Sequence, residues 1–126
     1  RWDSLAMDLI CSIASRVVRQ VIDQDADVAR RTLREVLTLV AQSPKIVVYL
    51  NPDDYETIQS NPTFWRPYIS RAAEIEMHTD PALSRGGCRV ETEHAAIDAS
   101  IETQLSKLIE ELIGHSSSDS ADPASV

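Results

Sequence analysis

The segment PALSRGGCRVETEHAAIDASIETQL, residues 81–105, carries the most specific structural pattern in this chain. Gly86 and Gly87 give the backbone the freedom that a turn needs, and they predict a hairpin connection. The residues that follow, 88–93, alternate in polarity like a strand with one wet face. The inward set of this strand is Cys88, Val90 and Thr92, and the outward set is Arg89, Glu91 and Glu93.

A helix follows this strand and forms the last predicted element. Asp98 or Ser100 is its expected N-cap, and Gly114 its expected end. Between them apolar residues recur at helical spacing: Ile101, Leu105, Leu108, Ile109 and Leu112. Residues 96–99 are a candidate short strand ahead of the helix. Residues 114–126 consist mainly of Ser, Asp, Ala and Pro and predict a disordered tail.

Upstream of this segment the periodicity predicts helices first and strands later. An amphipathic helix, capped at Asp3 or Ser4, runs to about Ile22, and a second helix covers residues 27–42. The apolar stripe of the first of these helices includes Leu9, Ile10, Ile13, Val17 and Val21. Residues 45–50 are apolar on both faces, as expected of a strand in the middle of a sheet, and residues 51–54 begin a short helix. Residues 74–79 alternate as a further strand.

The expected fold class is therefore α+β, with N-terminal helices followed by a small mixed sheet flanked by helices. The predicted organisation is a helical segment at 1–45, which could continue an upstream coiled coil, a globular domain at 46–113, and the tail. The chain has 126 residues, enough for one domain that buries roughly two thirds of its unfolded surface. No apolar run approaches the roughly 20 residues of a membrane-spanning helix, so we expect no membrane insertion and a cytoplasmic location.

The net charge of −8 is unevenly distributed. Residues 1–45 contain seven basic and six acidic residues, net +1, whereas residues 46–126 contain five and fourteen, net −9. This balance argues against nucleic acid as a partner and favours a basic protein surface. The one basic cluster, Arg30, Arg31 and Arg34, is interpreted as the solvated face of a helix.

The residues that could carry chemistry have simpler structural interpretations. Phosphate-binding, nucleophile-elbow and metalloprotease motifs are all missing, and we expect no catalytic residue, cofactor or metal. The candidate zinc ligands lack any known spacing: Cys88, His78, His94 and His115. Asp53 and Asp54 suit a helix N-terminus better than a magnesium site. Glu91 and Glu93 suit a solvated strand face better than an acid/base pair. The residues alone predict a soluble α+β binding domain, with a small enzyme as the alternative.

An aromatic cluster, Phe64, Trp65 and Tyr68, lies between Pro62 and Pro67. Such a cluster can form an adhesive patch for a partner, or it can attach a long loop to the core. Both interpretations stay open, and Trp65 and Tyr68 are kept as partner-binding candidates together with Glu91.

Residues 81–105 resemble the stator proteins of the export ATPases of flagella and type III secretion systems, the FliH/SctL (YscL/HrpE) family. The residues that carry the resemblance are Gly86, Gly87, Cys88, Val90, Glu91, Thr92, Ile97, Asp98, Ala99 and Ser100. The strand followed by Asn-Pro-Asp-Asp at residues 46–54 extends it. The sequence IDASIETQL, residues 97–105, is more similar to the injectisome branch of the family than to the flagellar branch.

The resemblance implies a regulatory subunit and not an enzyme. It implies a fold similar to the C-terminal domain of rotary-ATPase peripheral-stalk subunits, and a homodimer that binds the N-terminal domain of the export ATPase and restrains it. The implied location is the cytoplasm, peripheral to the inner-membrane base of the secretion apparatus. A far N-terminal segment would link such a protein to a cytoplasmic ring component, and that segment is not recognisable in these residues.

Overall fold

The structure is a computed structural model that describes the backbone of residues 2–25 and 27–125 and the side chains of residues 4–25 and 27–114. The chain is α+β, as predicted, with four helices, four strands and two short 3-10 turns among the described residues. In chain order they are α1 (Trp2–Gln24), α2 (Asp27–Leu39), β1 (Lys45–Leu50), α3 (Pro52–Gln59), η1 (Pro62–Phe64), η2 (Arg66–Tyr68), β2 (Glu74–Thr79), β3 (Cys88–Glu91), β4 (Ala96–Ala99) and α4 (Ile101–Ser125).

The four strands form one mixed sheet in the order β2-β1-β3-β4. β1 lies in the middle, as its apolar sequence predicted, parallel to β2 and antiparallel to β3. β3 and β4 form an antiparallel hairpin, and Thr92 and Ala95 exchange hydrogen bonds across its turn. Because β2 and β3 lie on opposite sides of β1, the Gly86-Gly87 loop crosses the end of β1. The predicted hairpin at these glycines was therefore wrong.

The core lies between one face of the sheet and helices α2 and α3. Alternate residues of β1, Ile46, Val48 and Leu50, are fully buried against Leu33 and Leu37 of α2. Cys88 and Val90 extend this core onto β3, as the alternation predicted. The strand ends at Glu91, so Thr92, expected to face inward, lies in the hairpin turn.

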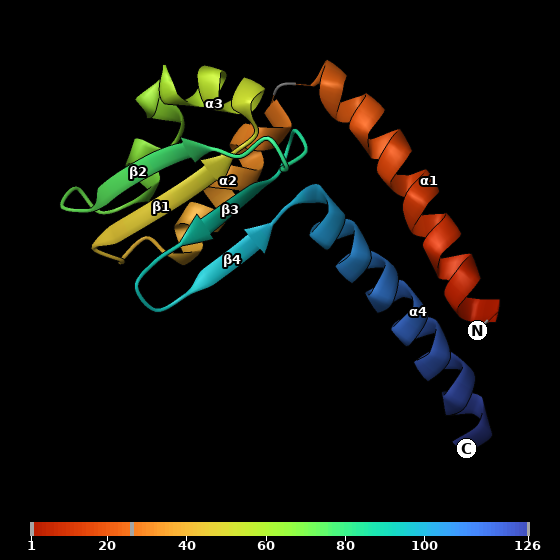
Figure 1. The fold of residues 1–126 in the computed structure, drawn as a ribbon. Helices are drawn as coiled ribbons and strands as arrows, with labels where there is room; N and C mark the ends of the chain where they lie inside the picture. The colour runs from red at the N-terminus through yellow and green to blue at the C-terminus, as the bar shows by residue number, and fades with distance from the viewer. Residues whose placement is uncertain (1, 26, 126) are drawn as a thin grey trace.

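Helices α1 and α4 project together from one end of the sheet domain (Figure 1). α2 ends at Leu39, three residues earlier than predicted, in a turn that leads into β1. α4 extends to Ser125, past the end predicted at Gly114. The side chains of residues 115–126 lie outside the described part of the structure, so the predicted tail and the division into segments stay predictions. Among the described residues, no helix is long and apolar enough to cross a membrane.

Candidate partner-binding surfaces

The Gly86 loop is fixed by a buried carboxylate from another element. Gly86 has a φ of +92°, in the left-handed region that suits glycine. Its amide donates a hydrogen bond of 2.8 Å to Oδ2 of Asp54, which is 3% exposed at the start of α3. Arg85 Nε lies 3.2 Å from the other Asp54 oxygen. Asn51 caps the helix by accepting the Asp53 amide, so Asp54 is free to hold the loop.

Gly87 allows a close backbone approach to the junction of β4 and α4. A Cβ atom at Gly87 would lie 2.8 Å from both Ile101 N and Ser100 Cα. Its φ is not in the left-handed region, so the reason for glycine here is space. The left-handed conformation belongs to Gly86 instead.

The remaining motif residues build β3, β4 and the start of α4. Burial raises the pKa of the Cys88 thiol to about 12, so this cysteine is an unreactive core residue. Asp98 accepts the Ser100 amide at 2.9 Å, and this backbone hydrogen bond lowers the pKa of Asp98. Ser100 Oγ accepts the Thr103 amide at 3.2 Å. Ser100 is thus the N-cap, positioned by Asp98, and both predicted alternatives take part.

Helix α1 has apolar residues on two faces. One face contacts its own domain through half-buried or buried side chains at helical spacing: Met7, Cys11, Ala14, Val18 and Ile22. The other is an exposed row at every fourth position, which we call the α1 ridge: Leu5, Leu9, Ile13, Val17 and Val21. These five side chains are between 53% and 64% exposed. An apolar row this long is unusual on the surface of a monomer and typical of a contact surface.

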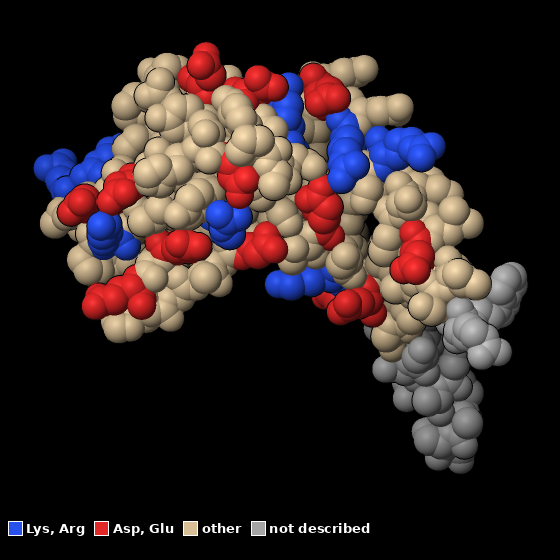
Figure 2. Space-filling model, in the orientation of Figure 1, with Lys and Arg blue, Asp and Glu red and all other residues tan. Residues whose placement is uncertain are grey.

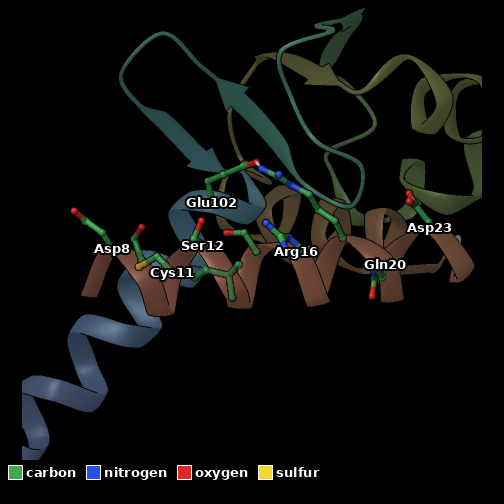
Figure 3. Close-up of a pocket in the computed structure, with 11 residues that line it drawn as sticks. Asp8, Cys11, Ser12, Arg16, Gln20, Asp23 and Glu102 are labelled. Carbon is green, nitrogen blue, oxygen red and sulfur yellow. Dashed lines mark hydrogen bonds and ion pairs between the residues drawn. The ribbon is translucent and has the colours of Figure 1, made fainter. Parts of the chain in front are cut away.

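Two grooves flank the contact between α1 and α4. The first, of about 550 Å³, is polar and contains Asp8, Cys11, Ser12, Arg16, Gln20, Asp23 and Glu102 (Figure 3). Arg19 also lines this groove, and its Nη2 atom forms an ion pair of 2.6 Å with Glu102. Burial opposes ionisation of Glu102, but hydrogen bonds from Ser84 and Arg19 outweigh it and lower the pKa of this carboxyl.

The second groove, of about 450 Å³, is mainly apolar and is lined by Val18, Ile101, Gln104, Leu105, Lys107, Leu108 and Glu111. Leu112 and Ile113 are exposed further along α4. The two projecting helices therefore offer two apolar surfaces, the α1 ridge and this groove. The groove fits a partner segment with an apolar face.

The aromatic cluster mainly attaches the loop after α3 to the domain. Phe64 and Trp65 are half-buried against the core, and the Trp65 indole N–H is buried without a partner among the described atoms. Tyr68 differs, because 39% of it is exposed. As a partner-binding candidate Tyr68 is accessible, whereas Trp65 offers little surface. The roles assigned to both residues stay predictions.

The uncovered face of the sheet is polar. Tyr49 lies between His78, stacked at 5.6 Å, and the Arg89 guanidinium, 4.3 Å from its ring. Glu91 is half-exposed here, 3.7 Å from Arg89. Figure 2 shows acidic and basic side chains interspersed over this face of the molecule. Water solvates a face that carries charges of both signs in this way, and each of its exposed ion pairs contributes little to stability.

The described residues bring no metal-ligating set together. Among them, no group of three or more His, Cys, Asp or Glu side chains converges. Cys88 is enclosed in the core, whereas His78 and His94 are exposed. The side chain of His115, the fourth candidate ligand, lies outside the described residues.

Comparison with known proteins identifies the family. The family model described as flagellar assembly protein FliH matches residues 3–108. Flagellar assembly protein FliH of Borreliella burgdorferi is 29% identical over 104 residues, 82% of this chain and 34% of that protein. A type 3 secretion system stator protein of Yersinia enterocolitica is 33% identical over 102 residues, 81% of this chain and 45% of that protein. The probable flagellar assembly protein FliH of Bacillus subtilis is 26% identical over 107 residues, 85% of this chain and 51% of that protein.

The chain thus spans between 34% and 51% of the length of these relatives. The matched residues include the Gly-Gly-Cys segment at 86–88 and nearly all of α1. Because the family model covers most of the chain, this protein belongs to the FliH family.

Proposed function

We propose that this chain is a stator and regulatory subunit, not an enzyme, that binds the N-terminal domain of a flagellar or type III secretion export ATPase. Through that contact it would help to control and position the ATPase during protein export. The observation that carries the proposal is the projecting pair of α1 and α4, which exposes the α1 ridge and the adjoining apolar groove. The relatives named as stator and flagellar assembly proteins support the same role.

The location and further partners follow from the same proposal. The protein would act in the cytoplasm, at the inner-membrane base of the secretion apparatus. It would form a homodimer, and the complex would reach a cytoplasmic ring component through a segment outside these residues. The charges fit a protein partner with a basic surface, because residues 46–126 carry a net charge of −9 from five basic and fourteen acidic residues.

Self-association is expected to depend on the α1 ridge. A variant with Ile13→Asp and Val17→Asp would place two charges in the middle of the ridge, where a second copy must exclude water. We expect the parent chain to be dimeric by light scattering and this variant to be monomeric with an unchanged circular dichroism spectrum. Leu39→Asp is the control, because Leu39 is 74% exposed on α2, away from the ridge. A parent chain that is monomeric at high concentration would contradict this prediction.

ATPase binding is expected to combine an apolar contact with electrostatic steering. Calorimetry of the chain against the N-terminal domain of the export ATPase should show binding, and Leu108→Asp with Leu112→Asp should weaken it at least roughly tenfold. The weakening should persist at high salt, because burial of apolar surface is not screened. Glu91→Lys should instead slow association, mostly at low salt, since surface charges act over about 10 Å at 0.1 M.

The same titration separates the stator from the alternative of a small enzyme or ligand-binding domain. The absence of binding heat at any salt, with both proteins folded, would remove the proposed function. Turnover of a small substrate by the chain alone would favour the alternative, and its polar groove would then be the first place to substitute. Tyr68→Ala belongs in the same series, to test whether this exposed aromatic residue contacts the ATPase.

A further inference from the structure

The fold joins two clusters that lie thirty residues apart in the sequence. Arg30, Arg31 and Arg34 lie on the outer side of α2, and the aromatic residues of η1 and η2 pack beside them. The Arg30 guanidinium lies 4.5 Å from the centroid of the Phe64 ring, and that of Arg34 lies 5.8 Å from the Tyr68 ring. Cation–π contact of this kind holds a guanidinium in place while its edge remains able to bind an anion. We call these five residues the arginine–aromatic surface.

Two hollows lie on the arginine–aromatic surface. One hollow, of about 240 Å³, is lined by Asp27, Arg30, Arg31, Arg34 and Phe64. The other, of about 360 Å³, is lined by Arg31, Arg34, Glu35, Thr38 and Tyr68. Arg31 and Arg34 line both hollows, so a segment that runs from one hollow to the other would meet both guanidinium groups. Neither hollow shares a lining residue with the grooves between α1 and α4.

The three arginines are not equally engaged within the chain. Arg30 is bound to Asp27 and stacked on Phe64. Arg31 is half-exposed and lies 3.4 Å from Asp25, a long contact. Arg34 forms no ion pair with any described residue, and its guanidinium lies over the Tyr68 ring. Arg31 and Arg34 are therefore the two arginines whose donors are accessible to a ligand, because the Arg30 Nε, which also lacks a partner among the described atoms, is buried.

We propose that the arginine–aromatic surface binds an acidic peptide segment of another protein. Two carboxylates of the segment would accept paired hydrogen bonds from Arg31 and Arg34, in the planar geometry that guanidinium favours. An apolar side chain of the segment would lie in the larger hollow against the exposed side of Tyr68. The surface is a second binding site, separate from the grooves between α1 and α4.

A short acidic segment fits this surface better than a polyanion does. The chain has a net charge of −8, which repels nucleic acid and anionic membranes at long range. Asp25, Asp27 and Glu35 border the arginines and leave only a narrow strip of positive charge. A peptide that places two carboxylates on this strip avoids the acidic side chains around it.

The test uses the whole chain and a fluorescein-labelled peptide in which two pairs of glutamate residues flank one leucine. Fluorescence anisotropy at low salt should show saturable binding, and the same peptide with glutamine in place of glutamate should not bind. Arg31→Glu with Arg34→Glu should weaken binding at least roughly tenfold, because two attractive contacts become repulsive. Arg16→Glu with Lys107→Glu makes the same change in net charge on α1 and α4, and should reduce binding much less.

Two further variants report on the details of the site. Tyr68→Ala should weaken binding severalfold with little dependence on salt. Asp25→Asn should strengthen it, because it releases Arg31, while the amide oxygen can still accept the hydrogen bond that Asp25 takes from the Asp27 amide at 3.0 Å. Calorimetry with the ATPase domain should be unchanged by the Arg31 and Arg34 substitutions, which separates failure of this inference from failure of the proposed function.

Several results would overturn the proposal. One is the absence of peptide binding at low salt. Another is an equal loss of binding in the Arg31→Glu, Arg34→Glu variant and in the charge-matched control, Arg16→Glu with Lys107→Glu. Parallel titrations with duplex RNA and with vesicles containing phosphatidylserine complete the test. Binding of either one, without binding of the peptide, would assign the surface to a polyanion instead.

Discussion

Replacing Gly87 with valine is expected to unfold this domain under conditions in which the parent is stable. The added Cβ would lie 2.8 Å from Ile101 N and Ser100 Cα and 3.0 Å from the Ala99 carbonyl oxygen. All three are backbone atoms at the junction of β4 and α4, so relief requires moving a strand, a helix or both. Overpacking of this kind costs about 3 kcal/mol or more, a large part of the total stability of a domain this size.

Gly114→Ala is the matched control for this substitution. Gly114 lies in α4, and a Cβ there would meet no described atom within 4 Å apart from the backbone of its own helix. Alanine should leave stability unchanged or raise it by roughly 0.5–1 kcal/mol, because glycine is the poorer helix former. Urea denaturation followed by circular dichroism measures both variants. A Gly87→Val protein as stable as the parent but unable to bind its partners would show that Gly87 is a contact residue instead.

The local pattern predicted the strands well, because residues 74–79 and 88–93 alternate in polarity and residues 45–50 contain a continuous apolar run. Residues 45–50, 74–79 and 96–99 match the observed strands residue for residue. The same reasoning failed at Gly86 and Gly87, where it predicted a hairpin. Two glycines show that the backbone turns, but not which strand the chain pairs with next. The pairing depends on β1, whose apolar residues make it the centre of the sheet.

The surfaces were harder to predict than the fold, because they depend on which of several faces is covered. The apolar stripe of α1 could have been its core face, yet the residues that contact α4 and the rest of the domain are the neighbouring set that includes Val18 and Ile22. Likewise Arg34 and Tyr68 meet only because the loop after α3 returns to α2. Sequence spacing along one helix contains no information on either arrangement.

Asp54 is the clearest case of a residue whose role the sequence concealed. Next to Asp53 at a helix start, it suited the helix dipole, and nothing in its spacing pointed to residues 85 and 86. In the structure it is buried and accepts hydrogen bonds from the Gly86 amide and from Arg85. The fold therefore uses two adjacent aspartates for different purposes, one exposed and one as a buried anchor for a loop.

Asp54→Ala is expected to destabilise the domain by about 2–4 kcal/mol, because it leaves a buried amide without an acceptor and Arg85 without its partner. Asp53→Ala, one residue away on the same helix, removes only an exposed charge near the helix start and should cost about 0.5 kcal/mol. Urea denaturation of the two variants measures the difference. Equal losses would mean that both aspartates act through the helix dipole and that the anchor is unimportant.

The consequence of losing this anchor should reach the partner-binding helices. A Cβ built on Gly86 would lie within 3.2 Å of side-chain atoms of Ile22 and Val28, so the loop that Asp54 holds is the surface on which the end of α1 and the start of α2 rest. Loosening the loop should free α1 before the sheet unfolds. We therefore expect Asp54→Ala, at temperatures where its sheet is intact, to expose α1 amides to hydrogen exchange and to weaken self-association, whereas Asp53→Ala should do neither.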